Sequence, residues 1–121
     1  MQSLNAILAT KLKTKQTMGF LDILGLGNKS AKVKELLSNG AIIVDVRSKA
    51  EYAGGSIAKS KNIPLENLSD YLENWKKSGQ QIVFCCASGM RSSSATRQAK
   101  AKGIDAMNGG GWASLSKFVD A

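Results

Sequence analysis

Hydrophobic and polar positions divide the chain into short apolar runs and longer amphipathic segments. The runs 41–46 and 81–85 are apolar without alternation, which predicts strands that are buried on both faces. Over 66–78 the apolar positions recur at helical spacing, which predicts an amphipathic helix. Its buried face is expected to consist of Leu65, Leu68, Leu72 and Trp75. Further helices are expected at 31–38, at 92–102 and after residue 111, and further strands at 61–63 and 104–107. This alternation indicates an α/β fold with a central parallel sheet of four to five strands, flanked by helices on both faces. The candidate for the fifth strand is 21–26.

Capping and turn residues set the expected boundaries of these elements. Ser30 is the expected N-cap of helix 31–38, and Asn39 and Gly40 are expected to end it, since both tolerate the left-handed backbone conformation. Residues 53–60 are rich in glycine and serine and predict a loop, and the three glycines at 109–111 predict a flexible turn before the last helix. The core-facing positions of the first and last helices are expected to be Val33, Leu36, Leu37, Trp112, Leu115, Phe118 and Val119.

Length and charge indicate one domain with a basic extension. The chain has 121 residues, of which 43% are hydrophobic, and a net charge of +8. Residues 1–34 carry six lysines against one acid, Asp22, and so account for +5 of this charge. We therefore expect residues 1–28 to be a basic, partly flexible N-terminal extension and residues 29–121 to be a single folded domain. Met18 opens a new segment within the extension, and we hypothesise that the natural chain starts there.

The composition argues against several classes of partner and cofactor. No aromatic side chains are interleaved with the basic segment, so we expect no nucleic acid partner. No apolar run approaches the ~18 residues of a membrane span, so we expect no membrane partner. The chain has no histidine, and its two cysteines are adjacent, which argues against both a cystine framework and a zinc site. We expect no metal and no cofactor, and a reducing, cytoplasmic location.

The candidate chemistry lies in one loop between a predicted strand and a predicted helix. Cys86 follows the apolar run 81–85, at a position where unpaired N–H groups and the positive end of a helix dipole favour an anion. The anion is the thiolate itself or a charged group on its sulfur. Because the chain has no histidine, backbone amides and a cation, Arg91, are expected to activate the thiol and to lower its pKa below the ordinary value of ~8.5. Cys85 alternates to the other face of the strand and is expected to be buried. The candidate anion-binding loop consists of Ala87, Ser88, Gly89, Met90, Arg91 and Ser92.

Three further residues are expected to support this site. In open parallel sheets, ligands bind beyond the carboxyl ends of the strands. Asp45 and Arg47 lie at the end of the predicted strand 41–46. Arg47 is expected to pair with Glu51 and so to pin the loop that follows, while Asp45 accepts backbone hydrogen bonds. Both residues of the strand end are thus expected to have a structural role.

Short motifs in a fixed order carry a family resemblance over residues 30–119. They are Val44–Arg47, Glu51-Tyr52, Gly55–Ile57, Asn62–Pro64, Cys86–Ser92, and Gly109-Gly110 with Trp112. Together they resemble the rhodanese family of sulfurtransferases. The resemblance implies a rhodanese-like fold for residues 29–121, in which Cys86 accepts a sulfane sulfur and becomes a persulfide. It also implies small sulfur-containing anions as substrates, with a protein as a further sulfur donor or acceptor. Family members that use thiosulfate often carry a basic residue where this chain has Ala87, and many relatives carry histidine at the position of Ser56.

Two other functions compete with sulfur transfer. Phosphatases and arsenate reductases also use a cysteine and an arginine on such a loop, but those families place five residues between the two. Only four residues separate Cys86 from Arg91, and no carboxylic acid lies near the loop in the sequence. A non-catalytic binding module with a rhodanese-like fold is the second alternative. The leading hypothesis is a sulfurtransferase that moves a sulfane sulfur from a donor, thiosulfate or a persulfide, to a thiophilic acceptor.

Overall fold

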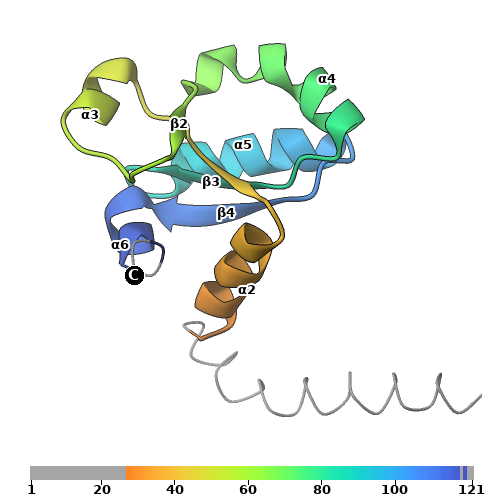
Figure 1. Ribbon diagram of the computed structural model, residues 1–121. Helices are drawn as coiled ribbons and strands as arrows, with labels where there is room; N and C mark the ends of the chain where they lie inside the picture. The colour runs from red at the N-terminus through yellow and green to blue at the C-terminus, as the bar shows by residue number, and fades with distance from the viewer. Residues whose placement is uncertain (1–26, 118, 120–121) are drawn as a thin grey trace, which may run out of the picture. The chain divides into compact units, whose positions relative to one another are not determined.

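Parallel strands in the order β2-β1-β3-β4 form the central sheet of the computed structural model, which describes residues 27–117 and 119 (Figure 1). The strands are β1 (Ile42–Asp45), β2 (Lys61–Asn62), β3 (Ile82–Cys86) and β4 (Ala106–Gly111). Each neighbouring pair is parallel, as predicted. The sheet therefore has four strands within the described residues. The candidate fifth strand, 21–26, lies outside them, as does most of the basic extension with Met18.

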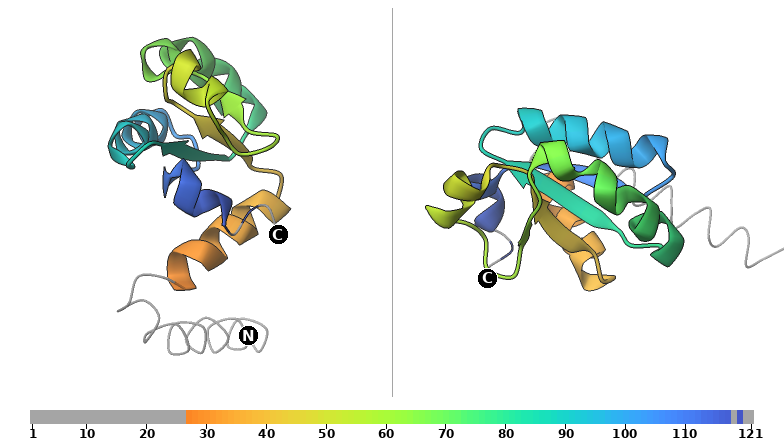
Figure 2. Two further views of the ribbon diagram at one scale, coloured as in Figure 1. Left: turned by 90° about the vertical axis from the view of Figure 1, so that its left-hand side faces the viewer. Right: turned by 90° about the horizontal axis from the view of Figure 1, so that it is seen from above.

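Helices cover both faces of this sheet. They are α2 (Gly27–Ser38), α3 (Lys49–Ala53), the 3₁₀ turn η1 (Leu65–Asn67), α4 (Ser69–Ser78), α5 (Met90–Ala101) and α6 (Trp112–Ser116). From Val33 onward the chain forms one compact unit. Within it, α4 and α5 lie on one side of the sheet, and α6 and the part of α2 that belongs to the unit lie on the other (Figures 1 and 2). This is the predicted α/β arrangement.

Two apolar clusters, one on each face of the sheet, hold the layers together. The first cluster packs Ile82 and Phe84 of β3 against Leu68, which precedes α4, and against side chains of α4 and α5, among them Leu72, Ala95 and Ala99. The second packs Val83 of β3 against Val33, Leu36 and Leu115 of α2 and α6. Every residue of β3 is buried, because both faces of the strand are covered. The alternation along β3 places Cys86 in the first cluster and Cys85 in the second.

Two helix starts differ from the sequence prediction. Helix α2 begins at Gly27, so Ser30 lies inside it and is not its N-cap. Residues 27–30 contain no proline, so their backbone can continue the helix. Helix α5 begins at Met90 and not at residue 92, because Gly89 takes a left-handed conformation with a φ of 100° and already turns the chain into the helix. The predicted end of α2 is confirmed, with Gly40 at a φ of 97° just beyond it.

The predicted helix 66–78 and the predicted loop 53–60 also differ in detail. The first turn of the predicted helix is the 3₁₀ turn η1, which follows Pro64, and the α-helix begins at Ser69. The predicted loop begins one residue later than expected, because Ala53 still belongs to the short helix α3. The sequence did not predict α3. Ser48 caps it in a capping box, in which the Ser48 hydroxyl accepts from the Glu51 amide and the Glu51 carboxylate accepts from the Ser48 amide.

The prediction of a flexible turn at residues 109–111 is wrong, because these glycines belong to strand β4. A Cβ atom on Gly109 would lie 2.9 Å from Val83 Cγ1 and 3.0 Å from the carbonyl oxygen of Phe84. A Cβ atom on Gly111 would lie 2.8 Å from the carbonyl oxygen of Ala87. At positions 109 and 111 glycine is required because β4 approaches its neighbours closely. At Gly110 the left-handed φ of 86° favours glycine within the strand.

The C-terminal helix is shorter than its expected apolar face. Leu115 is fully buried and Trp112 packs on the same cluster, as predicted, but α6 ends at Ser116. Val119 packs on the cluster from beyond the helix, and Phe118 lies outside the described residues. No helix among residues 27–117 is both long enough and apolar enough to cross a membrane.

Candidate functional site

Cys86 is the last residue of β3 and lies at the carboxyl edge of the sheet. The residues 87–89 that follow form a tight loop, and α5 begins at Met90. The neighbouring strand β1 ends at Asp45, which pairs with Cys85 in the register of the sheet. The two strand ends that the sequence placed at one edge are therefore adjacent in space. On the other side of β3, Cys86 pairs with Gly111 of β4.

The loop folds back so that its N–H groups point at the sulfur of Cys86. The Gly89 amide donates to Sγ over 3.0 Å, and the Ser92 amide donates over 3.4 Å. The Ser92 hydroxyl oxygen lies 3.4 Å from Sγ. The left-handed conformation of Gly89 turns these amides inward, which forms a small nest for an anion. Of the predicted loop residues, Ser92 is buried, Gly89 and Arg91 are half-buried, and Ala87, Ser88 and Met90 are exposed.

These hydrogen bonds decide the acidity of the thiol. Burial by itself raises the pKa of Cys86, because a charged sulfur is less stable away from water. The hydroxyl and amide of Ser92, with the amides of Gly89 and Ser88, outweigh burial and lower the pKa below its ordinary value. Burial raises the pKa of Cys85 to about 12, with a further contribution from Asp45. The two adjacent thiols therefore differ, and only Cys86 is poised to ionise.

Asn108 on β4 extends the network around Cys86, and sequence reasoning missed it. The Ser92 hydroxyl donates to Asn108 Oδ1 over 2.7 Å. Asn108 Nδ2 donates to the carbonyl oxygen of Gly89 over 3.1 Å, and Oδ1 also accepts from the Gly110 amide over 2.9 Å. One side chain thus holds both the loop and the hydroxyl beside the sulfur. The signal in the sequence is a polar residue next to the three glycines at 109–111, which the sequence predicts as a turn.

The expected ion pair between Arg47 and Glu51 does not form. Arg47 instead makes a bidentate pair with Asp45, with Nη2 2.7 Å from Oδ2 and Nε 2.9 Å from Oδ1. The two residues are two positions apart at the end of β1, so their side chains lie on the same side of the chain. Asp45 also accepts from the Arg47 amide, which confirms the predicted backbone hydrogen bond. Arg47 reaches Glu51 only through the carbonyl oxygen of that residue, over 3.2 Å.

The carboxylate of Glu51 binds Arg91 of the cysteine loop instead. Arg91 Nη1 and Nη2 lie 2.8 Å and 3.0 Å from its two oxygens. Arg91, with a further contribution from the Ser48 amide, lowers the pKa of Glu51 to about 2. Glu51 in turn raises the pKa of Arg91, and Cys86 contributes less to this shift. The cation that the sequence assigned to Cys86 is therefore paired with a carboxylate 40 positions away in the chain, and the hydrogen bonds of Ser92, Gly89 and Ser88 lower the pKa of Cys86.

Comparison with known proteins identifies the family of this fold. The family model for the rhodanese-like domain matches residues 29–116 of the chain. The chain belongs to the rhodanese-like domain family. A rhodanese-like domain protein from Staphylococcus aureus is 32% identical, with a TM-score of 0.59, and the match covers 72% of this chain and 86% of that one. The human single-domain sulfurtransferase TSTD1 is 31% identical, with a TM-score of 0.53, and the match covers 64% and 82% of the two chains.

The curated relative matches over a shorter stretch. The thiosulfate sulfurtransferase GlpE of Ectopseudomonas mendocina is 33% identical over 54 residues, which cover 45% of this chain and 50% of that protein. The match therefore spans about half the length of this relative.

Further contacts hold the loops around the cysteine of this rhodanese-like domain. The guanidinium of Arg47 lies over the ring of Trp112, 4.7 Å from its centroid, and donates to the carbonyl oxygen of Gly55 over 2.7 Å. Asn62 of β2 donates to the carbonyl oxygens of Asp45 and Arg47. These bonds tie β2, α6 and the loop after α3 to the end of β1, so that Glu51 is held within reach of Arg91.

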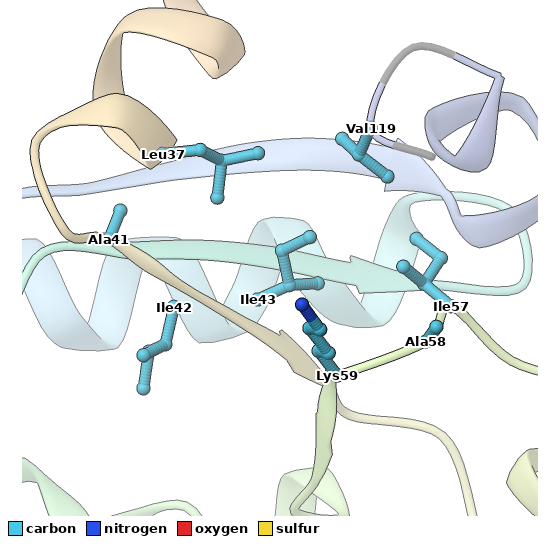
Figure 3. Close-up of a pocket in the computed structure, with 8 residues that line it drawn as sticks. All are labelled: Leu37, Ala41, Ile42, Ile43, Ile57, Ala58, Lys59 and Val119. Carbon is cyan, nitrogen blue, oxygen red and sulfur yellow. The ribbon is translucent and has the colours of Figure 1, made fainter. Parts of the chain in front are cut away.

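The rhodanese-like domain carries an apolar pocket apart from the cysteine loop. Its volume is about 250 Å³, and Figure 3 shows its lining residues. They are Leu37, Ala41, Ile42, Ile43, Ile57, Ala58, Lys59 and Val119. No residue of the 86–92 loop lines it. Among residues 27–117, no cluster of three or more carboxylate, cysteine or histidine side chains offers a metal site.

Proposed function

We propose that this rhodanese-like protein is a sulfurtransferase whose Cys86 carries the transferred sulfur as a persulfide. The observation that carries the proposal is the nest of donors around Sγ, led by the Gly89 amide at 3.0 Å, together with the lowered pKa of this thiol. Such a nest stabilises a sulfur anion without a histidine, and the chain has none. The named relatives TSTD1 and GlpE support the same chemistry.

In the first half-reaction the Cys86 thiolate attacks the outer sulfur of the donor. With thiosulfate, the S–S bond of the donor breaks and sulfite leaves with the electron pair. With a persulfide donor, the corresponding thiolate leaves. The outer sulfur remains on Cys86 as a persulfide anion, so that no oxidant or reductant is needed. The developing negative charge forms at the mouth of a loop whose amides already point inward, as in an oxyanion hole.

In the second half-reaction a thiophilic acceptor attacks the terminal sulfur of the persulfide. The S–S bond to Cys86 breaks, the sulfur leaves on the acceptor, and the thiolate is regenerated. The same donors, the hydroxyl and amide of Ser92 and the amide of Gly89, stabilise this leaving thiolate. A small anion such as cyanide or a protein thiol can act as the acceptor. The exposed residues Ala87 and Ser88 form the part of the loop that such an acceptor meets first.

A phosphatase function receives less support from the site. In the Cys86–Arg91 loop the arginine guanidinium is engaged by both oxygens of Glu51, whereas oxyanion chemistry requires it to hold the substrate. A purely structural binding module would not need donors arranged around a thiol of lowered pKa. Both alternatives give different results from sulfur transfer in the experiment below.

Mass spectrometry of the intact protein after exposure to thiosulfate or a glutathione persulfide tests the proposal. We expect the mass of one added sulfur, located on Cys86 and lost when cyanide is added. Cys86→Ser should abolish the gain, whereas the matched variant Cys85→Ser should retain it, because Cys85 lies on the opposite face of β3. Absence of added sulfur with either donor would refute sulfur transfer. Hydrolysis of a phosphate ester by the wild type in that case would favour the phosphatase.

A further inference from the structure

The hydroxyl of Ser92 stands between two acceptors. Its oxygen lies 3.4 Å from Cys86 Sγ on one side and 2.7 Å from Asn108 Oδ1 on the other. Ser92 is fully buried, so water does not compete for the hydroxyl. A serine hydroxyl has one proton to donate. The partner that receives this proton therefore determines what the oxygen presents to the sulfur.

The surroundings of Asn108 determine the orientation of its amide. The Gly110 amide is a pure donor and lies 2.9 Å from one end of the carboxamide, which must be the oxygen. The carbonyl of Gly89 is a pure acceptor and lies 3.1 Å from the other end, which must be the nitrogen. Both neighbours require the same orientation. The atom that faces Ser92 is consequently an acceptor only, and the Ser92 proton points at Asn108.

We propose that Asn108 is a positioning residue for Cys86. While Cys86 is a thiol, Asn108 accepts the hydrogen bond of the Ser92 hydroxyl. When Cys86 is a thiolate, the hydroxyl donates this hydrogen bond to the sulfur instead. In the thiol state the chain of donors runs from the Cys86 S–H to the Ser92 oxygen and from the Ser92 O–H to Asn108. In the thiolate state the hydroxyl rotates toward the charged sulfur, because a charged acceptor forms the stronger hydrogen bond. No proton leaves Ser92 in this change.

The role of this switch in catalysis rests on the proposed function. When sulfur is added, Cys86 Sγ loses its negative charge to the outer sulfur, and the hydroxyl returns to Asn108. When the acceptor removes the outer sulfur, the charge returns to Sγ and the hydroxyl follows it. The hydroxyl thus donates to Sγ at the two stages at which Sγ is anionic, as the attacking thiolate and as the leaving thiolate.

Asn108 is more than a tether for the loop. The carbonyl oxygen of Gly89, which accepts from Asn108 Nδ2, also accepts from the Ser93 amide over 3.0 Å. This backbone bond belongs to the first turn of α5 and survives any change at Asn108. Loss of the Asn108 side chain therefore leaves the loop carbonyl bonded, but it removes the competing acceptor for the Ser92 proton.

The ultraviolet absorbance of the thiolate, followed against pH, tests the proposal without any substrate. We expect Asn108→Leu to lower the pKa of Cys86, because the Ser92 hydroxyl then has only the sulfur to bind. One net hydrogen bond corresponds to roughly a two- to tenfold higher thiolate fraction at a fixed pH below the pKa. Asn108→Asp keeps the acceptor and adds a negative charge, so it should shift the pKa in the opposite direction. Cys86→Ser gives the background absorbance.

The Ser92→Ala background separates positioning from structure. Without the hydroxyl, Asn108→Leu should no longer lower the pKa of Cys86. An equal shift in both backgrounds, or an upward shift in the Asn108→Leu variant, would overturn the proposal. The charged neighbours, the Arg91–Glu51 pair and the Asp45–Arg47 pair, are unchanged in every variant.

Circular dichroism checks that each variant folds. If Asn108→Leu does not fold, Asn108→Asp alone tests the proposal. A carboxylate binds the Ser92 hydroxyl more strongly than the amide does, so Asn108→Asp should raise the pKa of Cys86 more when Ser92 is present than in the Ser92→Ala background. An equal shift would then refute the proposal. Because these measurements involve no sulfur donor, they distinguish a failure of this proposal from a failure of sulfur transfer. A wild type that accepts no sulfur but shows the expected pKa pattern would refute only the proposed function.

Discussion

Substitution of Gly111 by alanine should disturb the cysteine loop through a single methyl group. Gly111 has a φ of −70° and a ψ of 136°, which alanine adopts without strain. The added Cβ would, however, lie 2.8 Å from the carbonyl oxygen of Ala87, the residue that follows Cys86. Ordinary Cβ contacts begin at 3.4 Å, so the loop or the strand must move by about 0.6 Å. The Cβ position is fixed by the backbone of residue 111 and the Ala87 oxygen is a backbone atom, so neither can rotate away.

The change in the free energy of unfolding expected for Gly111→Ala follows from two opposing contributions. Overpacking by one methyl group costs about 1–3 kcal/mol of unfolding free energy. The smaller conformational freedom of alanine in the unfolded chain returns about 0.4–1 kcal/mol. We therefore expect Gly111→Ala to lose about 1–2 kcal/mol in urea unfolding. We also expect a higher pKa for Cys86, because a displaced loop lengthens the hydrogen bond from the Gly89 amide to Sγ, now 3.0 Å.

Gly103→Ala provides the matched control. Gly103 lies beyond the far end of α5 with a φ of 85°, and nothing lies within 4 Å of its added Cβ. The left-handed conformation should cost alanine about 1–2 kcal/mol, a loss similar to that of Gly111→Ala. The pKa of Cys86 should not change in the control. If both variants shift the pKa equally, or if Gly111→Ala shifts neither stability nor pKa, the close approach of β4 does not hold the loop.

Three further predictions concern charge. Asp45→Ala should lower the free energy of unfolding in urea by about 3–5 kcal/mol, because it leaves the buried guanidinium of Arg47 without its carboxylate. A loss below about 1 kcal/mol would show that the backbone carbonyl acceptors of Arg47 are enough to stabilise the buried guanidinium. The alkylation rate of Cys86 should rise with pH and reach half its plateau below the ordinary ~8.5. An alkylation midpoint above ~8.5 would contradict the hydrogen-bond network around Cys86. Since folding lowers the pKa of Cys86, its ionisation stabilises the folded state above the ordinary pKa, and this stabilisation is lost as the pH falls through the folded pKa. Glu51→Gln should free Arg91 for anions and raise the rate with dianionic thiosulfate relative to that with a monoanionic alkyl persulfide. An unchanged ratio would mean that the ion pair does not influence the choice of donor.

Local patterns predicted the layers of the fold because those patterns reflect burial. The apolar runs 41–46 and 81–85 became the central strands β1 and β3, and the helical spacing over 66–78 became η1 and α4. Helix starts were less predictable: a positive φ at Gly89 is expected for a glycine and is observed at 100°, but only the folded loop showed that α5 begins directly after it, at Met90. The three glycines at 109–111 show the same limit. A glycine that allows a turn and a glycine that allows close packing look alike in a sequence.

The sequence by itself determined which thiol lies at a strand end before a helix, and it assigned Cys85 to the opposite face. These properties follow from the alternation along one strand and from the dipole of one helix, both of which are local. Only the tertiary structure decided the partners of the side chains around Cys86. Glu51 meets Arg91 across 40 positions, and Asn108 meets Ser92 across 16. Such pairs depend on the distance between strands and helices that pack against one another, and hydrogen bonds and ion pairs form only within about 3 Å. No pattern along the chain specifies that distance, so the residues that tune the thiol became visible only in the folded protein.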